Sequence, residues 1–74
     1  MPSYELRGVL RIWVNNKEKV IVTIRDKETG IYRDLDVTDE QDDVVRAVAH
    51  RLNTDEREIE IPKHVRICRG RSHG

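Results

Sequence analysis

The chain has 74 residues, 38% of them charged and 36% hydrophobic, and its 14 basic side chains balance its 14 acidic ones. This length allows one domain with a thin core and little room for a substrate pocket, so we expect no enzyme, no catalytic residues and no cofactor. The sequence has neither the pattern of a secretory signal nor a run of about 18 apolar residues that could cross a membrane. Its single cysteine, Cys68, cannot form an internal disulfide, so the expected location is cytoplasmic.

Charge is distributed unevenly along the chain. Residues 1–33 carry seven basic and four acidic side chains, a net charge of +3, and residues 61–74 carry four basic and no acidic ones, a net charge of +4. Residues 34–60 carry three basic and ten acidic side chains, a net charge of −7. A strongly charged partner would therefore meet different surfaces on different parts of the molecule.

Two alternating segments predict a β-hairpin at the start of the chain. In residues 4–14, the apolar side chains of one parity are assigned to the core: Leu6, Leu10, Ile12 and Val14. The opposite parity contains Arg7, Val9, Arg11 and Trp13. Gly8 is a candidate for a bulge or a bend, and Asn15-Asn16-Lys17 suits a turn. Residues 19–25 form the returning strand, with the core side chains Val20, Val22 and Ile24.

A third strand and one helix follow. The loop of residues 26–30 ends on Gly30, which suits a left-handed conformation, and residues 31–37 continue as a strand. Its predicted core side chains are Ile31, Leu35 and Val37. Thr38 and Gln41 fit a capping box, which predicts a helix with Thr38 as its N-cap and its end near Asn53. The buried stripe of this helix would contain Val45, Val48, Ala49 and Leu52.

The last part of the chain predicts two short strands and a tail. Ile59 and Ile61 alternate with glutamates before Pro62, and residues 64–68 alternate again. A single domain of residues 1–68 is then followed by a mobile basic tail of residues 69–74. The predicted fold is α+β: an antiparallel sheet of four to five strands with one helix on one face, in the order β-β-β-α-β-β. The alternative is a β-grasp fold whose hairpin is formed by residues 20–37.

The sheet face opposite the helix is the candidate binding surface. On the parities above, it carries the candidate site residues Arg7, Arg11, Trp13, Lys19, Thr23, Arg25, Tyr32 and Arg66. Exposed Trp and Arg are typical of interface hot spots, and Arg side chains on a strand pair can read the DNA major groove. The simpler interpretation is a solvated face on which Trp13 packs against arginine stems.

Histidine and cysteine do not predict a metal site. His64 and Cys68 are four residues apart, which on a strand separates them by about 13 Å. Structural zinc needs four converging ligands, so we expect no metal ligands in this chain.

Part of the chain resembles the ethylene-response-factor DNA-binding domain of plants. The matching residues fall within residues 7–51: Arg7-Gly8-Val9, Trp13, Ile24-Arg25-Asp26, Gly30, Leu35, Thr38 and Glu40. The resemblance implies three antiparallel strands with a packed helix, and DNA contacts from Arg7, Arg11, Trp13 and Arg25. The chain departs from that family in its longer first hairpin, in Asp36 where the family has glycine, and in valines where the family helix is rich in alanine.

Two functions of different classes follow from these patterns. The first is a small module for transcription regulation that binds nucleic acid through the Arg and Trp side chains of the sheet, which the resemblance and the basic ends favour slightly. The acidic residues of 34–60 would repel phosphates, so the helix could not enter a DNA groove. The second is an adaptor or inhibitor that docks on a larger protein, which the balanced net charge favours. Neither a membrane partner nor a small-molecule substrate is implied.

Overall fold

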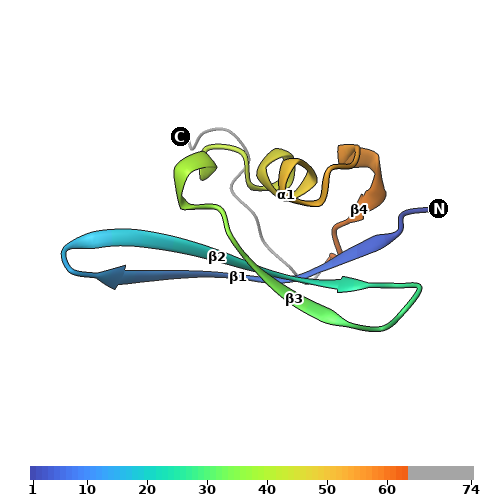
Figure 1. The fold of residues 1–74 in the computed structure, drawn as a ribbon, viewed down its shortest axis with the longest axis horizontal. Helices are drawn as coiled ribbons and strands as arrows, with labels where there is room; N and C mark the ends of the chain where they lie inside the picture. The colour runs from blue at the N-terminus through green and yellow to red at the C-terminus, as the bar shows by residue number, and fades with distance from the viewer. Residues whose placement is uncertain (64–74) are drawn as a thin grey trace.

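A computed structural model describes residues 1–63 as one β-sheet with a helix packed on one face (Figure 1). Its elements are β1 (Tyr4–Val14), β2 (Lys17–Asp26), β3 (Tyr32–Asp36), the 3₁₀ helix η1 (Thr38–Glu40), α1 (Val44–Leu52), the 3₁₀ helix η2 (Glu56–Glu58) and β4 (Ile59–Glu60). The strand order in the sheet is β3-β2-β1-β4. The predicted α+β class is therefore confirmed. In the part of the chain that the structure describes, no helix is long and apolar enough to cross a membrane.

The sheet is mixed, and the prediction of an antiparallel sheet is wrong for β4. β1 pairs antiparallel with β2, and β2 with β3, whereas β4 pairs in parallel with β1 through residues 59–60 opposite residues 4–5. The segment from η1 to η2 acts as the crossover that a strand needs to return to the sheet in parallel. The β-grasp alternative took residues 20–37 as a hairpin followed by the helix and two short strands. β2 and β3 do pair as a hairpin, and the strand after the helix joins β1. The fifth strand predicted at 64–68 and the tail of 69–74 lie outside the described residues.

The turn between β1 and β2 follows directly from its two asparagines. Asn15 and Asn16 both have positive φ, 53° and 65°, as a two-residue type I′ hairpin turn requires. Asparagine adopts this conformation more readily than most residues. Val14 lies opposite Lys17 on either side of the turn, so the register of the outer hairpin is fixed there.

A bulge in β1 reverses the predicted parity of the outer strand. Leu6 lies opposite Ile24 and Gly8 lies opposite Thr23, so Arg7 is an extra residue in β1. Paired residues of adjacent strands point to the same face, and the residues beyond the bulge therefore follow their β2 partners. The assignment of Leu10, Ile12 and Val14 to the core is wrong, because the bulge places them on the face opposite α1. Arg11 lies opposite buried Val20 on the helix side, and Trp13 has the same parity.

β3 is shorter than predicted. Ile31 was expected in the core but is 60% exposed, because the chain is still in the loop at this residue and β3 begins at Tyr32. Leu35 is half-buried against the core and Val37 is fully buried, as expected. Gly30 has a φ of 77°, which agrees with the left-handed conformation predicted for the loop.

The helix starts five residues later than the capping box predicted, with its N-cap at Asp43 and not at Thr38. α1 begins at Val44, and its N-cap is Asp43, whose Oδ1 accepts a hydrogen bond from the Arg46 amide at 3.2 Å. Thr38 instead opens η1, and its Oγ1 accepts a hydrogen bond from the Val20 amide at 3.0 Å. The T-x-x-Q pattern thus predicted a helical turn correctly but not the start of the main helix. α1 ends at Leu52, and Asn53 adopts the left-handed cap conformation with a φ of 56°.

The core is confined to the inner part of the sheet, beneath α1. It consists of Leu6, Val20, Val22, Ile24, Val37, Val44, Val45, Ala47, Val48 and Ile59. The nine residues of α1 span about 14 Å, whereas the 11 residues of β1 can span about 36 Å. Figure 1 shows the turn of the β1–β2 hairpin projecting well beyond α1. The helix therefore leaves the outer hairpin without a covering layer in the described structure.

Candidate functional site

The predicted binding face is divided between the two faces of the sheet. Pairing with β2 and β3 places Lys19, Thr23, Arg25 and Tyr32 on the open face, which is the face opposite α1. Arg11 and Trp13 lie on the helix-side face, and Arg7 is the bulge residue. Arg66 lies outside the described residues. The Arg and Trp side chains that were expected to act together therefore do not form one surface.

The basic side chains of the open face are accompanied by carboxylates. The contacts are Arg7 with Glu5 at 3.3 Å, Arg25 with Glu5 at 3.8 Å, Lys19 with Asp36 at 3.5 Å, and a hydrogen bond from Thr23 to Asp34 at 2.7 Å. These acidic residues lie on the strands of the same sheet, where the sequence prediction had emphasised the basic ones. Within residues 1–63, the open face is consequently mixed in charge, with its basic side chains beside carboxylates.

On the helix-side face, Arg11 is engaged within the molecule. Its Nη1 donates a hydrogen bond to Oε1 of Gln41 at 3.1 Å and lies 3.6 Å from Oε2 of Glu18. Gln41 precedes α1, so Arg11 connects the hairpin to the segment that leads into the helix. Trp13 lies opposite Glu18, nearer the turn, and remains 73% exposed.

An apolar strip on the open face was missed by the sequence analysis. We call residues Leu10–Val14 of β1 the outer segment. Leu10, Ile12 and Val14 are 55%, 36% and 42% exposed, and half-buried Ile21 on β2 lies directly opposite Leu10. The signal that could have found this strip was Gly8, because a bulge at that point moves every later side chain of β1 to the other face.

The outer edge of β1 carries these apolar side chains without a neighbouring strand. Among residues 1–63, β4 pairs only with Tyr4 and Glu5, and residues 6–14 of β1 have no strand on that side. Unpaired strand edges expose backbone donors and acceptors, and proteins usually protect them with short strands, charged residues or a cover. The outer segment contains a single charged residue, Arg11, and no strand of residues 1–63 covers its edge, so this part of the chain does not supply that protection.

The opposite edge of the sheet is protected in the usual way. β3 has only five residues, and three of them, Arg33, Asp34 and Asp36, are charged. Both aspartates also contact β2, through Thr23 and Lys19. Among the described residues, the two edges of the sheet therefore differ in length, polarity and protection.

A cluster of charged residues joins η1 to α1. Arg51 donates hydrogen bonds to the carbonyl of Asp36 at 3.2 Å and to Glu40 at 2.8 Å, and it also contacts Asp39. Nδ1 of His50 lies 2.9 Å from Oε2 of Glu40. Hydrogen bonds from His50 and Arg51 hold the pKa of Glu40 below its ordinary value, and those to Asp39 and Glu40 raise the pKa of Arg51. The partners are all internal, so the cluster fastens the two helical segments together.

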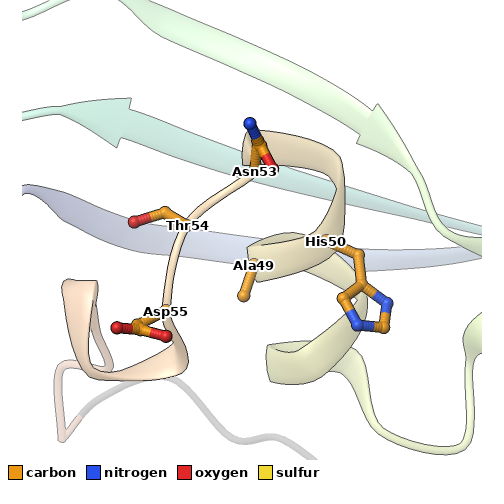
Figure 2. Close-up of a pocket in the computed structure, with 5 residues that line it drawn as sticks. All are labelled: Ala49, His50, Asn53, Thr54 and Asp55. Atoms are coloured by element: carbon orange, nitrogen blue, oxygen red, sulfur yellow. The ribbon is translucent and has the colours of Figure 1, made fainter.

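The hollow at the end of α1 has no convergent chemistry. It is lined by Ala49, His50, Asn53, Thr54 and Asp55, and Figure 2 shows these side chains pointing in different directions. The imidazole of His50 is already in contact with Glu40. Within residues 1–63, no three His, Cys, Asp or Glu side chains are placed so that they could hold a metal ion.

Comparison with known protein families, curated proteins and solved structures gives no significant match for this chain. The resemblance to the ethylene-response-factor domain thus stays a prediction. The features that bear on function are those of the molecule itself, and the unprotected edge of β1 is the most distinctive of them.

Proposed function

We propose that this protein is a non-catalytic protein-binding module, and that its binding surface is the outer edge of β1. A partner protein would contribute an extended strand that pairs with residues 6–14 and thereby enlarges the sheet. The observation that carries this proposal is the long, apolar edge of β1, which has no neighbouring strand among the described residues. Strand addition of this kind is a common mode of peptide recognition.

Both the backbone and the side chains of β1 support strand addition. The backbone supplies a row of hydrogen-bonding groups, which gives affinity without selecting a sequence. Selectivity would come from the side chains on the two faces. Leu10, Ile12 and Val14 would contact alternate residues of the added strand on the open face. Arg11 and Trp13, two residue types common in interface hot spots, would contact it on the other face.

Nucleic acid is a less favoured partner on the same observations. The chain carries 14 basic and 14 acidic side chains, a net charge of zero, so it has no overall excess of positive charge to attract phosphates. The basic side chains on the open face lie beside Glu5, Asp34 and Asp36, and the exposed Trp13 is on the other face. Because duplex binding depends on neutralising phosphates with lysine and arginine, this arrangement favours a protein partner.

Selection of peptides from a random displayed library against the full-length chain tests this proposal. The selected peptides would be titrated against the wild type, against Ile12→Lys in the outer segment, and against Tyr32→Lys as a control on β3. Tyr32 lies on the same face and is 56% exposed, so its substitution introduces the same charge at the protected edge. We expect Ile12→Lys to weaken binding by about ten-fold or more and Tyr32→Lys to leave it nearly unchanged.

The same experiment can contradict the proposal in two ways. The β1 edge would be excluded if the peptides bound both variants equally well. It would also be excluded if peptide binding changed the NMR amide shifts of β3 and not those of β1. A titration with mixed-sequence duplex DNA at low salt forms the second arm. Binding that falls steeply with salt and weakens in Arg25→Ala would support the nucleic-acid function instead, because each lost phosphate contact reduces the salt dependence.

A further inference from the structure

The outer segment of β1 is complementary to itself in the antiparallel direction. Its sequence is Leu10-Arg11-Ile12-Trp13-Val14. When two copies are placed side by side with Ile12 opposite Ile12, Leu10 of each copy faces Val14 of the other, and Arg11 of each faces Trp13 of the other. This arrangement has two-fold symmetry, which is the usual symmetry of a protein dimer.

We propose that a second copy of this chain is a strand partner of β1, paired antiparallel about Ile12. The inference rests on the proposed function, since it uses the same edge, and it adds the identity of one partner and the register. The central sheet of the dimer would run β3-β2-β1-β1-β2-β3 across the two copies. Both unprotected edges would be removed in a single contact.

On the open face, this register joins two apolar strips into one cluster. Leu10, Ile12 and Val14 of one copy would lie directly opposite Val14, Ile12 and Leu10 of the other. Ile21 flanks Leu10 on β2 and would border the cluster on each side. Directly opposed apolar side chains on adjacent strands stabilise a sheet, and these residues are 36–55% exposed in the single chain.

On the helix-side face, the same register pairs a cation with an aromatic ring. Arg11 of each copy would face Trp13 of the other, and Trp is the ring that binds a guanidinium best. Glu18 lies opposite Trp13 on β2 and 3.6 Å from Nη1 of Arg11 in the same chain. The Glu18 carboxylate would therefore hold the Arg11 guanidinium of its own copy on this face, close to Trp13 of the other copy.

Neighbouring registers fit less well. Pairing about Arg11 would place two guanidinium groups opposite each other, which destabilises a sheet. Pairing about Leu10 would bring Asn15 opposite Glu5, where β4 already occupies the edge. Pairing about Trp13 would leave Leu10 and Arg11 facing the polar turn residues Asn16 and Asn15. Of these four registers, only the one about Ile12 pairs apolar side chains on the open face and Arg11 with Trp13 on the helix-side face. It also ends before the residues of β1 that pair with β4.

Disulfide cross-linking of the full-length chain tests the register directly. In a Cys68→Ser background, Ile12→Cys should form a dimer by itself, because opposed residues of antiparallel strands have the Cα separation of about 4.4–6.8 Å that a disulfide needs. Leu10→Cys alone should cross-link about ten-fold more slowly, since its partner in the register is residue 14. A mixture of Leu10→Cys and Val14→Cys should give the mixed dimer. Diamide, as oxidant, takes up the two electrons and two protons of each thiol pair.

Equal cross-linking rates for Ile12→Cys, Leu10→Cys and the mixture would overturn the register. Sedimentation measurements at rising concentration give the second readout. Ile12→Lys places two lysines opposite each other on the symmetry axis and should weaken association by about ten-fold or more, whereas Tyr32→Lys should not. Circular dichroism establishes that both variants fold.

A wild-type chain that stays monomeric at about 1 mM would also overturn self-pairing, because a dimer weaker than that has no measurable stability in solution. If the library peptides still bind at β1 in that case, the proposed strand-binding function stands without a second copy. If Ile12→Lys destabilises a monomeric chain, a segment of the same chain pairs with β1, and both proposals fail. Dimers that form equally well with Ile12→Lys would place self-association on another surface.

Discussion

The inner half of β1, residues 4–9, and its outer half, the outer segment Leu10–Val14, each contain a Leu-Arg pair but have different surroundings. Leu6 and Leu10 are the same residue type in one strand, four residues apart, yet Leu6 is fully buried and Leu10 is 55% exposed. The bulge at Arg7 separates them, because it moves Leu10 to the open face, which α1 does not cover. In a domain with one helix, the apolar residues on the helix-side face of the sheet form the core.

The same division appears along the edge of the strand. The inner half pairs with β4 through Tyr4 and Glu5, whereas the outer half has no strand beside it among the residues described. The inner half therefore stabilises the fold, and the outer half is where we propose that a partner strand binds. Substitutions in and around the two halves test this contrast between a structural half and an interaction half.

The largest effect is expected from equal truncations in the two halves. Leu6→Ala should lower the free energy of unfolding by about 2–5 kcal/mol, because it leaves a cavity beneath α1. Leu10→Ala should change it by about 0.5 kcal/mol or less, since that side chain is largely in solvent. Urea denaturation of both variants measures the difference. Similar losses in the two would mean that the outer half is buried after all.

Two glycines, Gly8 in β1 and Gly30 in the loop before β3, test the conformation of the backbone. Gly30 has a φ of 77°, so Gly30→Ala should cost about 1–2 kcal/mol. A Cβ added at Gly8 would meet no atom within 4 Å, and this residue is not left-handed, so Gly8→Ala should stabilise the protein by about 0.4–1 kcal/mol. Thermal unfolding of the two variants should shift in opposite directions. A loss of stability in Gly8→Ala would show that the bulge needs the flexibility of glycine.

The helix start provides a smaller and more local test. Asp43→Ala removes the N-cap of α1 and should cost about 1 kcal/mol. Thr38→Ala leaves the half-buried amide of Val20 without its 3.0 Å partner and should cost a similar amount, about 1 kcal/mol, for a different reason. Neither substitution touches the outer segment, so peptide affinity at the β1 edge should not change. An unaltered denaturation midpoint in Asp43→Ala would place the start of the helix elsewhere.

The smallest effect concerns the stability of the fold in acid, through carboxylates of β3 and η1. The pKa of Glu40 is lowered by its hydrogen bonds to His50 and Arg51, and that of Asp36 is lowered by hydrogen bonds from Thr38. A carboxyl group whose pKa is lowered by folding stabilises the folded state at pH values above its ordinary pKa, which is about 4.3 for glutamate. This stabilisation is lost as the pH falls through the lowered pKa. Glu40→Gln should therefore flatten the acid side of the stability profile. Glu28→Gln, in the loop before β3, serves as the control.

The sequence predicted the buried residues of β2 and of the helix well, but it did not predict which face the outer residues of β1 occupy. Val20, Val22 and Ile24 were assigned to the core and are buried, as are Val45 and Val48 of the helix. The candidate site residues do not share one face, because their assignment depended on counting residues through Gly8. One extra residue in a strand reverses the face of every residue after it, so a single local irregularity transferred Arg11 and Trp13 away from Lys19 and Arg25.

The sequence by itself determined the features that short-range chemistry controls. Asn15-Asn16 specified the hairpin turn, because asparagine tolerates positive φ, and regular alternation specified the buried face of β2. Only the tertiary structure decided three others: the parity of the outer segment, the choice of Asp43 over Thr38 as the helix cap, and the parallel pairing of β4 with β1. Each of these depends on which distant segments pack together, and a local pattern contains no information about the length of a helix relative to the sheet that it covers.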